Sequence, residues 1–473
     1  TRSSWVTGVQ TCALPICLKA ILVVAIGVGC FSLLLPLLQK NFAHRTTHYI
    51  AIIGEYDLHN LPPVVKDQLS LGLMEVDTDG SFSPALASEL TIDSTGTRYV
   101  FSFNQEHYWH DGKIFSPADV VYPLQEVQVT ASDTQLIYQL PAVSAAFPQH
   151  LVEPLLRFEQ QKRWWWQREM VYGLGKVSLL DYTYTNRWQN SLSQVVLFDH
   201  QTKERWIYRF YHTQAQAITA YKLGEVDVLF EITNLSEIKD WETTLVQERL
   251  LPDQYLVVFF NCSLPQFTRS VRQALSYALE KERAGYTRAP GPIAESSWAY
   301  FKGLNHYEKN LDLAIERLLD NLPEEKLELN LTTTTAYYDI ASQIKKEWED
   351  LGAKAASVCR SKSEIKDKTA CEYLALQVNV QTVTFPDTNN FQTLLIGQQV
   401  TNDPDQYGLW HSDLATNFTH YKNTKVDSLL EKGRQTIDTK ERLAIYQDFQ
   451  QNLLDDPPAV FLWNLKSYDL VRY

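Results

Sequence analysis

One stretch of the sequence, Thr401–Ser412 (TNDPDQYGLWHS), gathers side chains that are suited to holding a solute. Two aspartates flank a proline there, and Tyr407 and Trp410 supply aromatic faces. The proline disfavours a helix at the residue before it and Gly408 permits a tight turn, so we predict a loop. Loops that combine acidic groups with aromatic faces often carry binding residues. Aspartates in such a loop can equally cap the neighbouring backbone.

Composition and motifs exclude several classes of function. The 473 residues predict two or three domains, and a net charge of -13 without a basic run argues against a nucleic-acid partner. No GxSxG or HExxH motif is present, so we expect no enzyme and no catalytic residues. The six cysteines form no CxxC pair and have no histidine cluster beside them, so we predict no metal site and no cofactor. Cys359 and Cys371 can pair in an oxidising compartment or stay as two buried thiols, and the sequence leaves both open.

The first forty residues are set apart from the rest. Residues 1–17 resemble translated sequencing-adapter sequence, so we interpret them as an artefact and expect truncation at both ends of the chain. From Ala20 to Leu38 no residue is charged, over about the length that a bilayer core requires. We therefore predict that residues 18–40 are a signal peptide or a transmembrane anchor.

The remaining chain has two kinds of pattern. Short strands with turn signals are predicted between residues 73 and 172, and helices alternate with strands after Tyr172. Thr213 and Gln216 form a capping box for a helix that Gly224 ends, and the apolar Tyr255–Asn261 is typical of a strand buried on both faces. These patterns predict an α/β fold with a strand-rich insertion.

Three further helices are predicted from their caps and apolar stripes. Ser116, followed by proline, is expected to begin one helix. A second carries an apolar stripe that includes Trp348 and is expected to end at Gly352. A third is expected to begin after Asp438 and to end at Pro457.

An ordered series of motifs resembles the family 5 extracytoplasmic solute-binding proteins of ABC importers, which include oligopeptide, dipeptide and nickel binders. The series is YWHDGKIFSPADVVY at Tyr108–Tyr122, AITAYKLGEVDV at Ala217–Val228, YLVVFFN at Tyr255–Asn261, VRQALSYALEKE at Val271–Glu282, GPIAESSWAY at Gly291–Tyr300, NDPDQYGLWHS at Asn402–Ser412 and YKNTKVDSLLEKG at Tyr421–Gly433. The resemblance runs from about Tyr49 to Tyr473, which is nearly all of the chain after the predicted anchor.

The resemblance implies a two-lobed periplasmic-binding-protein-like fold (type II, cluster C). Lobe I would comprise residues 46–72, 173–262 and 457–473, with residues 73–172 as its strand-rich subdomain. Lobe II would comprise residues 263–456. The chain would cross between the lobes and allow closure about a hinge.

The function that the resemblance implies is the substrate-binding part of an ABC importer. The protein would bind an oligopeptide or similar solute and deliver it to permease subunits. We expect it to be a monomer at the extracytoplasmic face of the membrane (periplasm or cell surface), anchored by its N-terminal segment. The alternative is a membrane-tethered solute sensor with the same fold and no transport role.

The resemblance also suggests ligand-binding residues. In peptide-binding members, an aspartate just upstream of the DPD run anchors the amino group of the ligand, whereas here the matching position falls near Val400. We therefore expect the ligand to be held by neighbouring polar and aromatic side chains, with Trp164–Trp166 as further aromatic candidates. The predicted ligand-binding set is Trp298, Gln398, Gln399, Thr401, Asn402, Asp403, Tyr407 and Trp410.

Overall fold

The computed structural model describes residues 46–163, 166–186, 190–238, 241–304, 306–320, 322–363 and 368–473. The predicted artefact and the predicted membrane segment, residues 1–40, lie outside them, as do Trp164 and Trp165. Within the described ranges, no helix is both long and apolar enough to cross a membrane. Contacts divide the chain into two units. The first comprises the described residues up to Leu58 together with Lys176–Val228, and the second comprises His59–Gly175 and Leu229–Tyr473.

The first unit is a sheet with strands in the order β10-β11-β12-β1 and one helix, α3. Its elements are β1 (Thr47–Ile53), β10 (Val177–Asn186), β11 (Ser191–Asp199), β12 (Arg205–Tyr211) and α3 (Gln214–Lys222). The cap that the sequence predicts at Thr213 is confirmed for α3. The Gln216 backbone N–H donates to the Thr213 hydroxyl at 3.3 Å, which satisfies one of the free donors at the helix start.

The second unit begins with the strand-rich stretch. Strands β4, β5, β7 and β6 form one antiparallel sheet, while β2 pairs with β3 and β8 with β9. Their bounds are β2 (Met74–Val76), β3 (Phe82–Pro84), β4 (Glu89–Ile92), β5 (Arg98–Ser102), β6 (Gln128–Ala131), β7 (Gln135–Gln139), β8 (Arg157–Arg163) and β9 (Trp166–Tyr172), with helices α2 (Pro63–Leu69), η1 (Pro117–Asp119) and η2 (Phe147–Leu151). Buried aromatic side chains, among them Phe101 and Tyr138, form the core of this stretch.

The helix that the sequence predicts after Ser116 is not formed, and this prediction is wrong. Ser116 and Asp119 do form the capping box, but the structure contains only the three-residue 3₁₀ turn η1 before Val120 becomes extended. Pro123 limits any helix here to the residues before Tyr122, because a proline disfavours the helical conformation in the residue before it.

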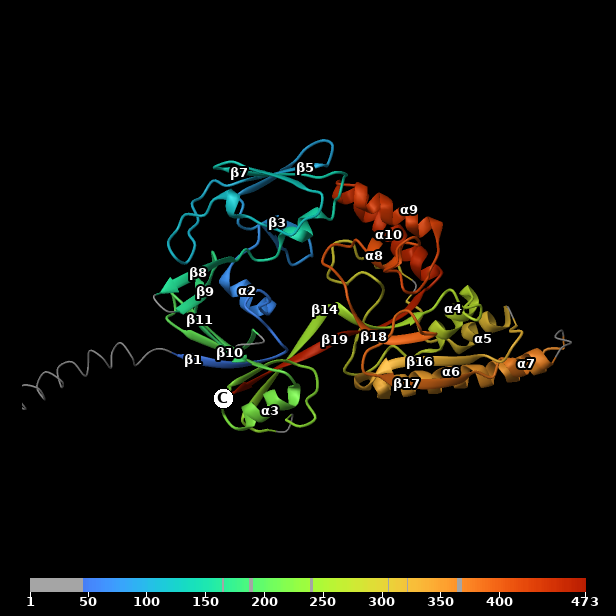
Figure 1. Cartoon of the computed structure of the whole chain (residues 1–473). Coiled ribbons are helices and arrows are strands. Elements are labelled where there is room, and N and C mark those ends of the chain that lie inside the picture. Colours follow the sequence, from blue (N-terminus) through green and yellow to red (C-terminus); the bar gives the residue numbers. More distant parts are fainter. Residues whose placement is uncertain are drawn as a thin grey trace, which may run out of the picture. The chain divides into compact units, whose positions relative to one another are not determined.

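The larger sheet of the second unit has the strand order β13-β19-β14-β18-β16-β17, with β15 paired to β19. Helices α4, α5 and α6 pack against one another, and Figure 1 shows α6 running along β16 and β17. The strands are β13 (Val228–Ile232), β14 (Thr244–Phe260), β15 (Thr287–Arg288), β16 (Glu328–Thr334), β17 (Gln377–Val383), β18 (Thr393–Gln399) and β19 (Ala459–Arg472). The helices are α4 (Arg269–Ala278), α5 (Leu311–Asp320), η3 (Thr335–Tyr337), α6 (Tyr338–Ser361), α7 (Thr369–Tyr373), α8 (Tyr407–Trp410), α9 (Thr424–Gln435) and α10 (Thr439–Asp455).

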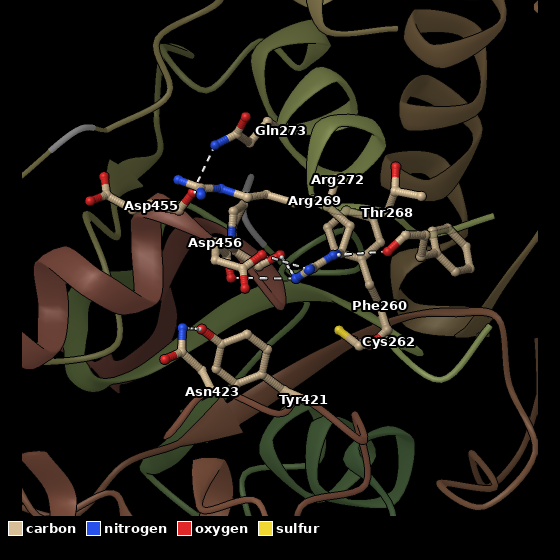
Figure 2. Close-up of polar contacts among 12 residues, drawn as sticks. Phe260, Cys262, Thr268, Arg269, Arg272, Gln273, Tyr421, Asn423, Asp455 and Asp456 are labelled. Atoms are coloured by element: carbon tan, nitrogen blue, oxygen red, sulfur yellow. Dashed lines mark hydrogen bonds and ion pairs between the residues drawn. The ribbon is translucent and has the colours of Figure 1, made fainter. Parts of the chain in front are cut away.

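The C-terminus of α10 is covered by side chains from α4 (Figure 2). Arg269 Nε and Gln273 Nε2 donate to the Asp455 carbonyl at 2.9 and 2.7 Å. Buried Arg272 donates to the Pro457 carbonyl at 2.8 Å and forms an ion pair with the Asp456 carboxylate at 2.6 Å. The last turn of α10 has no basic residue of its own, so α4 supplies both the donors and the positive charge that a helix C-terminus favours. The predicted cap of α10 is confirmed, since Asp438 accepts from the Lys440 and Glu441 backbone N–H groups.

Cys359, near the end of α6, forms a disulfide with Cys371 in α7. This settles the alternative that the sequence left open in favour of a covalent pair. Of the described cysteines, Cys262 is a free thiol and is partly buried.

The prediction that this helix ends at Gly352 is also wrong, because α6 continues to Ser361. A Cβ atom at position 352 would collide with the Leu376 backbone nitrogen and would lie 2.8 Å from the Leu374 carbonyl oxygen. Glycine therefore allows the helix to approach the chain that leads into β17, and it does not act here as a helix terminator.

We expect Gly352→Ala to lower the free energy of unfolding by about 1–3 kcal/mol, because the displaced backbone costs more than the helix propensity of alanine returns. Chemical denaturation measures the change. Gly408→Ala is the matched control, since position 408 is also helical and a methyl group there would meet no heavy atom within 4 Å beyond its chain neighbours and its own helix backbone. Equal stability of the two variants would contradict the packing role of Gly352.

Candidate functional site

The loop that follows β18 differs in one respect from the predicted one. Residues Tyr407–Trp410 form the short helix α8, so Gly408 lies inside a helical turn and not in a tight loop turn. The helix is possible because Pro404 restricts only the residue before it, while the Tyr407 N–H is capped by the Asp405 carboxylate at 3.0 Å.

A buried ion pair fixes this loop. Asp403 is 2 % exposed, and its two carboxylate oxygens accept from Arg442 Nη1 and Nη2 at 2.8 and 2.6 Å. Burial by itself would lower the pKa of Arg442, but the hydrogen bonds and the charge of Asp403 raise it above its ordinary value. This bidentate geometry is the strongest arrangement for an arginine and a carboxylate. We predicted that Asp403 contacts the ligand, but in the structure its charge is paired with Arg442 of α10.

Asp405 and Tyr407 are held in a second, more exposed arrangement. Arg434 of α9 donates to the Asp405 carboxylate at 2.8 Å, and its guanidinium lies 4.0 Å from the centre of the Tyr407 ring. The tyrosine ring also stacks on buried His411, with ring centres 4.2 Å apart. Both aspartates also accept from a backbone N–H two residues ahead, Asp403 from Asp405 at 2.9 Å and Asp405 from Tyr407 at 3.0 Å, as the capping interpretation proposed.

The two tryptophans of the predicted set lie in different surroundings. Trp410 is fully buried, and its indole N–H donates to the Gln406 side-chain oxygen at 2.7 Å. A side chain without exposed surface cannot touch a ligand in this conformation, so we assign Trp410 to the core beside Phe259. Trp298 is partly exposed, lies under the Arg442 guanidinium, and its backbone N–H donates to the Asp79 carbonyl at 2.7 Å.

Two adjoining cavities lie beside the start of the loop. One has a volume of about 130 Å³ and the other about 400 Å³, and both are bordered by Asp253, Val400, Thr401 and Asn402. Segments far apart in the sequence complete the walls. The smaller cavity adds Gly80, Pro252, Ile293, Ala294, Ser296, Ser297, Pro404 and Gln406, and the larger adds Phe82, Gln149, Val152 and Gln399. Their combined size is suited to a small solute or a short peptide segment.

Four predicted polar residues lie at or next to these cavities. Gln399, Thr401 and Asn402 are exposed and line them. Gln398 is partly buried and donates to the Gln399 carbonyl at 2.7 Å. The structure therefore brings the polar part of the predicted set together and separates it from Trp410.

Asp253 is a cavity residue that the sequence did not reveal. Its strand, β14, pairs with β18 in a register that sets Gln254 opposite Gln399, and the Val400 N–H donates to the Asp253 carbonyl at 2.8 Å. The β14–β19 register is interrupted between Leu251 and Tyr255, so Asp253 lies in a bulge. Bulges redirect side chains, and this one places Asp253 on the wall of both cavities. A proline next to an aspartate at the edge of a long apolar strand is the local signal that marks the bulge.

Comparisons with known proteins agree with this architecture. No family model matches the chain. The oligopeptide-binding protein AppA of Bacillus subtilis (strain 168) is 24 % identical over 222 residues, which are 41 % of this chain and 38 % of AppA. The alignment thus spans less than half of that relative's length.

Solved structures are similar over most of the chain. The ABC transporter substrate-binding protein CtaP from Listeria monocytogenes has a TM-score of 0.71 at 19 % identity and covers 91 % of this chain and 94 % of its own. NikZ from Campylobacter jejuni, solved in complex with Ni(L-His), has a TM-score of 0.66 at 20 % identity with the same coverage. At these identities the likeness shows the fold. The predicted α/β fold of the two-lobed solute-binding proteins is confirmed.

We expect Asp403→Asn to lower the free energy of unfolding by about 3–5 kcal/mol, because it leaves the Arg442 charge buried without its partner. Urea denaturation followed by circular dichroism measures the loss. Asp350→Asn is the control, since Asp350 pairs with Lys354 at 2.7 Å on an exposed helix face, where an ion pair contributes less than about 1 kcal/mol. A loss at position 403 no larger than that at position 350 would show that the loop does not depend on this pair.

Proposed function

We propose that the protein is the extracytoplasmic substrate-binding component of an ABC importer, and that it binds an oligopeptide or similar solute. The ligand would occupy the two adjoining cavities beside the loop. Gln398, Gln399, Thr401 and Asn402 would offer it hydrogen bonds, with Trp298 as the aromatic candidate nearby. Lobe closure about a hinge would complete the site without any covalent step.

The observation that carries the proposal is the pair of cavities at this loop in a chain with the solute-binding fold. Exposed amide and hydroxyl side chains line the cavities next to a backbone that an ion pair holds rigidly. A rigid frame with polar groups on its surface reduces the ordering cost of binding. AppA is named as an oligopeptide-binding protein, which supports a peptide as the solute. CtaP is named as an ABC transporter substrate-binding protein and is similar in structure over 91 % of this chain, which supports the transporter role.

The lobes and the location belong to the same proposal. Residues 46–72, 173–262 and 457–473 would form lobe I with the strand-rich residues 73–172, and residues 263–456 would form lobe II. The Cys359–Cys371 disulfide supports an oxidising compartment, such as the periplasm or the cell surface. Residues 18–40 would anchor the chain there as a monomer, next to its permease subunits.

We expect Asn402→Trp to abolish solute binding, because Asn402 borders both cavities and an indole would fill much of their volume. Mass spectrometry of molecules that co-purify with residues 46–473 identifies the solute, and a thermal-shift assay with a peptide pool measures binding. Asn389→Trp is the matched control, because this exposed residue precedes β18 at the end of the strand opposite the cavities.

Two outcomes would contradict the proposal. One is that neither co-purified solutes nor any peptide in the pool binds the wild-type chain. The other is that Asn402→Trp binds as tightly as Asn389→Trp while both variants melt at the wild-type temperature.

The disulfide makes a separate prediction about the compartment. In protein isolated without reductant and then unfolded, an alkylating reagent should label Cys262 and leave Cys359 and Cys371 unlabelled, which peptide mapping detects. The paired variant Cys359→Ala/Cys371→Ala should lose about 2–4 kcal/mol of unfolding free energy, because the cross-link constrains the unfolded chain. Labelling of all three residues before reduction would argue against an oxidising location.

A further inference from the structure

We propose that Asp253 is the residue that selects the ligand, and that it does so by binding a primary ammonium group. This inference rests on the proposed function and specifies its ligand. Gly397–Thr401 contain no carboxylate, and strand pairing places Asp253 next to Val400, whose N–H donates to the Asp253 carbonyl.

The charge of the cavity walls is the first observation. Among the described residues that line either cavity, Asp253 carries the charge, and the others are apolar, hydroxyl or amide side chains or glycine and proline. No lysine, arginine or histidine is among these lining residues. A cavity with one carboxylate and no lining cation favours a ligand that brings a positive charge.

The state of the carboxylate is the second observation. Asp253 is partly buried, and its Oδ2 accepts one hydrogen bond, from the neutral Gln399 amide at 3.3 Å. A carboxylate has about four lone-pair positions, so it retains acceptor capacity towards the cavities. A neutral amide does not cancel its charge.

The surroundings of Asp253 are acidic as well. Arg249 is shared between Asp469 at 2.9 Å and Glu231 at 3.8 Å, so two carboxylates already use that guanidinium. The pKa of Glu231 is raised, mainly by burial, and the charges of Asp469 and Asp253 add to the effect while Arg249 opposes it. Asp253 therefore lies close enough to Glu231 for their charges to interact, and the arginine beside Glu231 is already shared between Glu231 and Asp469.

A further acceptor lies in the same cavity. The Gln149 side-chain oxygen is buried and has no hydrogen-bond partner among the described residues. It belongs to the wall of the larger cavity, which Asp253 also lines. An ammonium group brings three N–H donors, whereas a carboxylate or phosphate ligand would bring acceptors to acceptors. The chemistry of both residues favours a donor-rich cationic ligand.

The test compares free and blocked amino groups on variants of residues 46–473. The probes are an equimolar pool of tripeptides with free amino termini, the same pool after N-acetylation, and spermidine as an ammonium ligand without a peptide. Isothermal titration calorimetry measures each dissociation constant. Asp253→Asn removes the charge with little change of shape, and Asp133→Asn removes one charge from an exposed position between β6 and β7.

We expect the wild-type chain and Asp133→Asn to bind the free pool, spermidine or both, and to bind the acetylated pool at least about tenfold more weakly. Asp253→Asn should weaken binding of the amine probes by about 10- to 100-fold and remove the discrimination against acetylation. If Asp253→Asn loses affinity for the peptides alone, Asp253 binds the amino terminus of a peptide. If it loses affinity for spermidine alone, Asp253 binds a polyamine. Either result supports an ammonium ligand.

Three results would overturn the inference. Unchanged affinity of Asp253→Asn for every amine probe would remove Asp253 from ligand selection, and equal affinity of the wild-type chain for both peptide pools would remove the ammonium requirement. Either result leaves the proposed binding function intact. Absence of binding to all probes, with no co-purified solute, would overturn the proposed function and this inference with it.

Discussion

The position of the candidate site depends on the buried ion pair between Asp403 and Arg442. A carboxylate and a guanidinium removed from water gain little net stability as a pair, but neither can lose the other without a large cost. The two parallel hydrogen bonds therefore specify where the chain must run after β18. The ring of Pro404 fixes its own φ angle, and the Asp405 carboxylate accepts from the Tyr407 N–H at the start of α8. The exposed Thr401 and Asn402 come directly before Asp403, so the ion pair of Asp403 also determines where they lie.

A second constraint is the register of β14, which pairs with β19 on one side and β18 on the other. Six successive residues at the end of β14, from Tyr255, are almost completely buried, so a shift by one residue would place polar atoms in the core. The ladder is interrupted just before this buried run. The interruption is tolerated because Pro252 lacks an N–H group, its carbonyl accepts from the Asn464 side chain, and the Val400 N–H donates to the Asp253 carbonyl.

These two constraints explain which parts could be predicted from the sequence. Caps at Thr213 and Asp438 act over three residues, so the local pattern sufficed, and the apolar run at Tyr255–Asn261 indicated a covered strand. Gly352 was misinterpreted because a glycine that ends a helix and a glycine that admits a neighbouring chain look alike in sequence, and the neighbour lies beyond the helix at Leu376. The ordered motifs indicated the fold because each of them belongs to a different element of it.

The candidate site was predictable only where its members are adjacent in the chain. Gln398 to Asn402 could be found as one stretch, whereas Asp253 reaches Gln399 across 146 positions through strand pairing. Trp410 could not be placed from the sequence for a different reason. Indole and phenol rings can pack in a core as well as against a ligand. The Trp410 ring can be buried because its N–H donates to the Gln406 side chain inside the protein.

The distribution of charge within this region has a consequence for binding. Asp403 and Asp405 are both neutralised by arginines of the helices behind the loop, so they add rigidity and little net field. Asp253 has no such partner within hydrogen-bonding distance among the described side chains, apart from an amide. Two carboxylates are thus paired within the loop and its supporting helices, while Asp253 lines the cavities; under the proposal made for Asp253, holding the loop and attracting the ligand are tasks of different residues. A ligand bound at Asp253 would then leave the Asp403–Arg442 ion pair undisturbed, because Asp253 and Asp403 share no hydrogen-bond partner among the described residues.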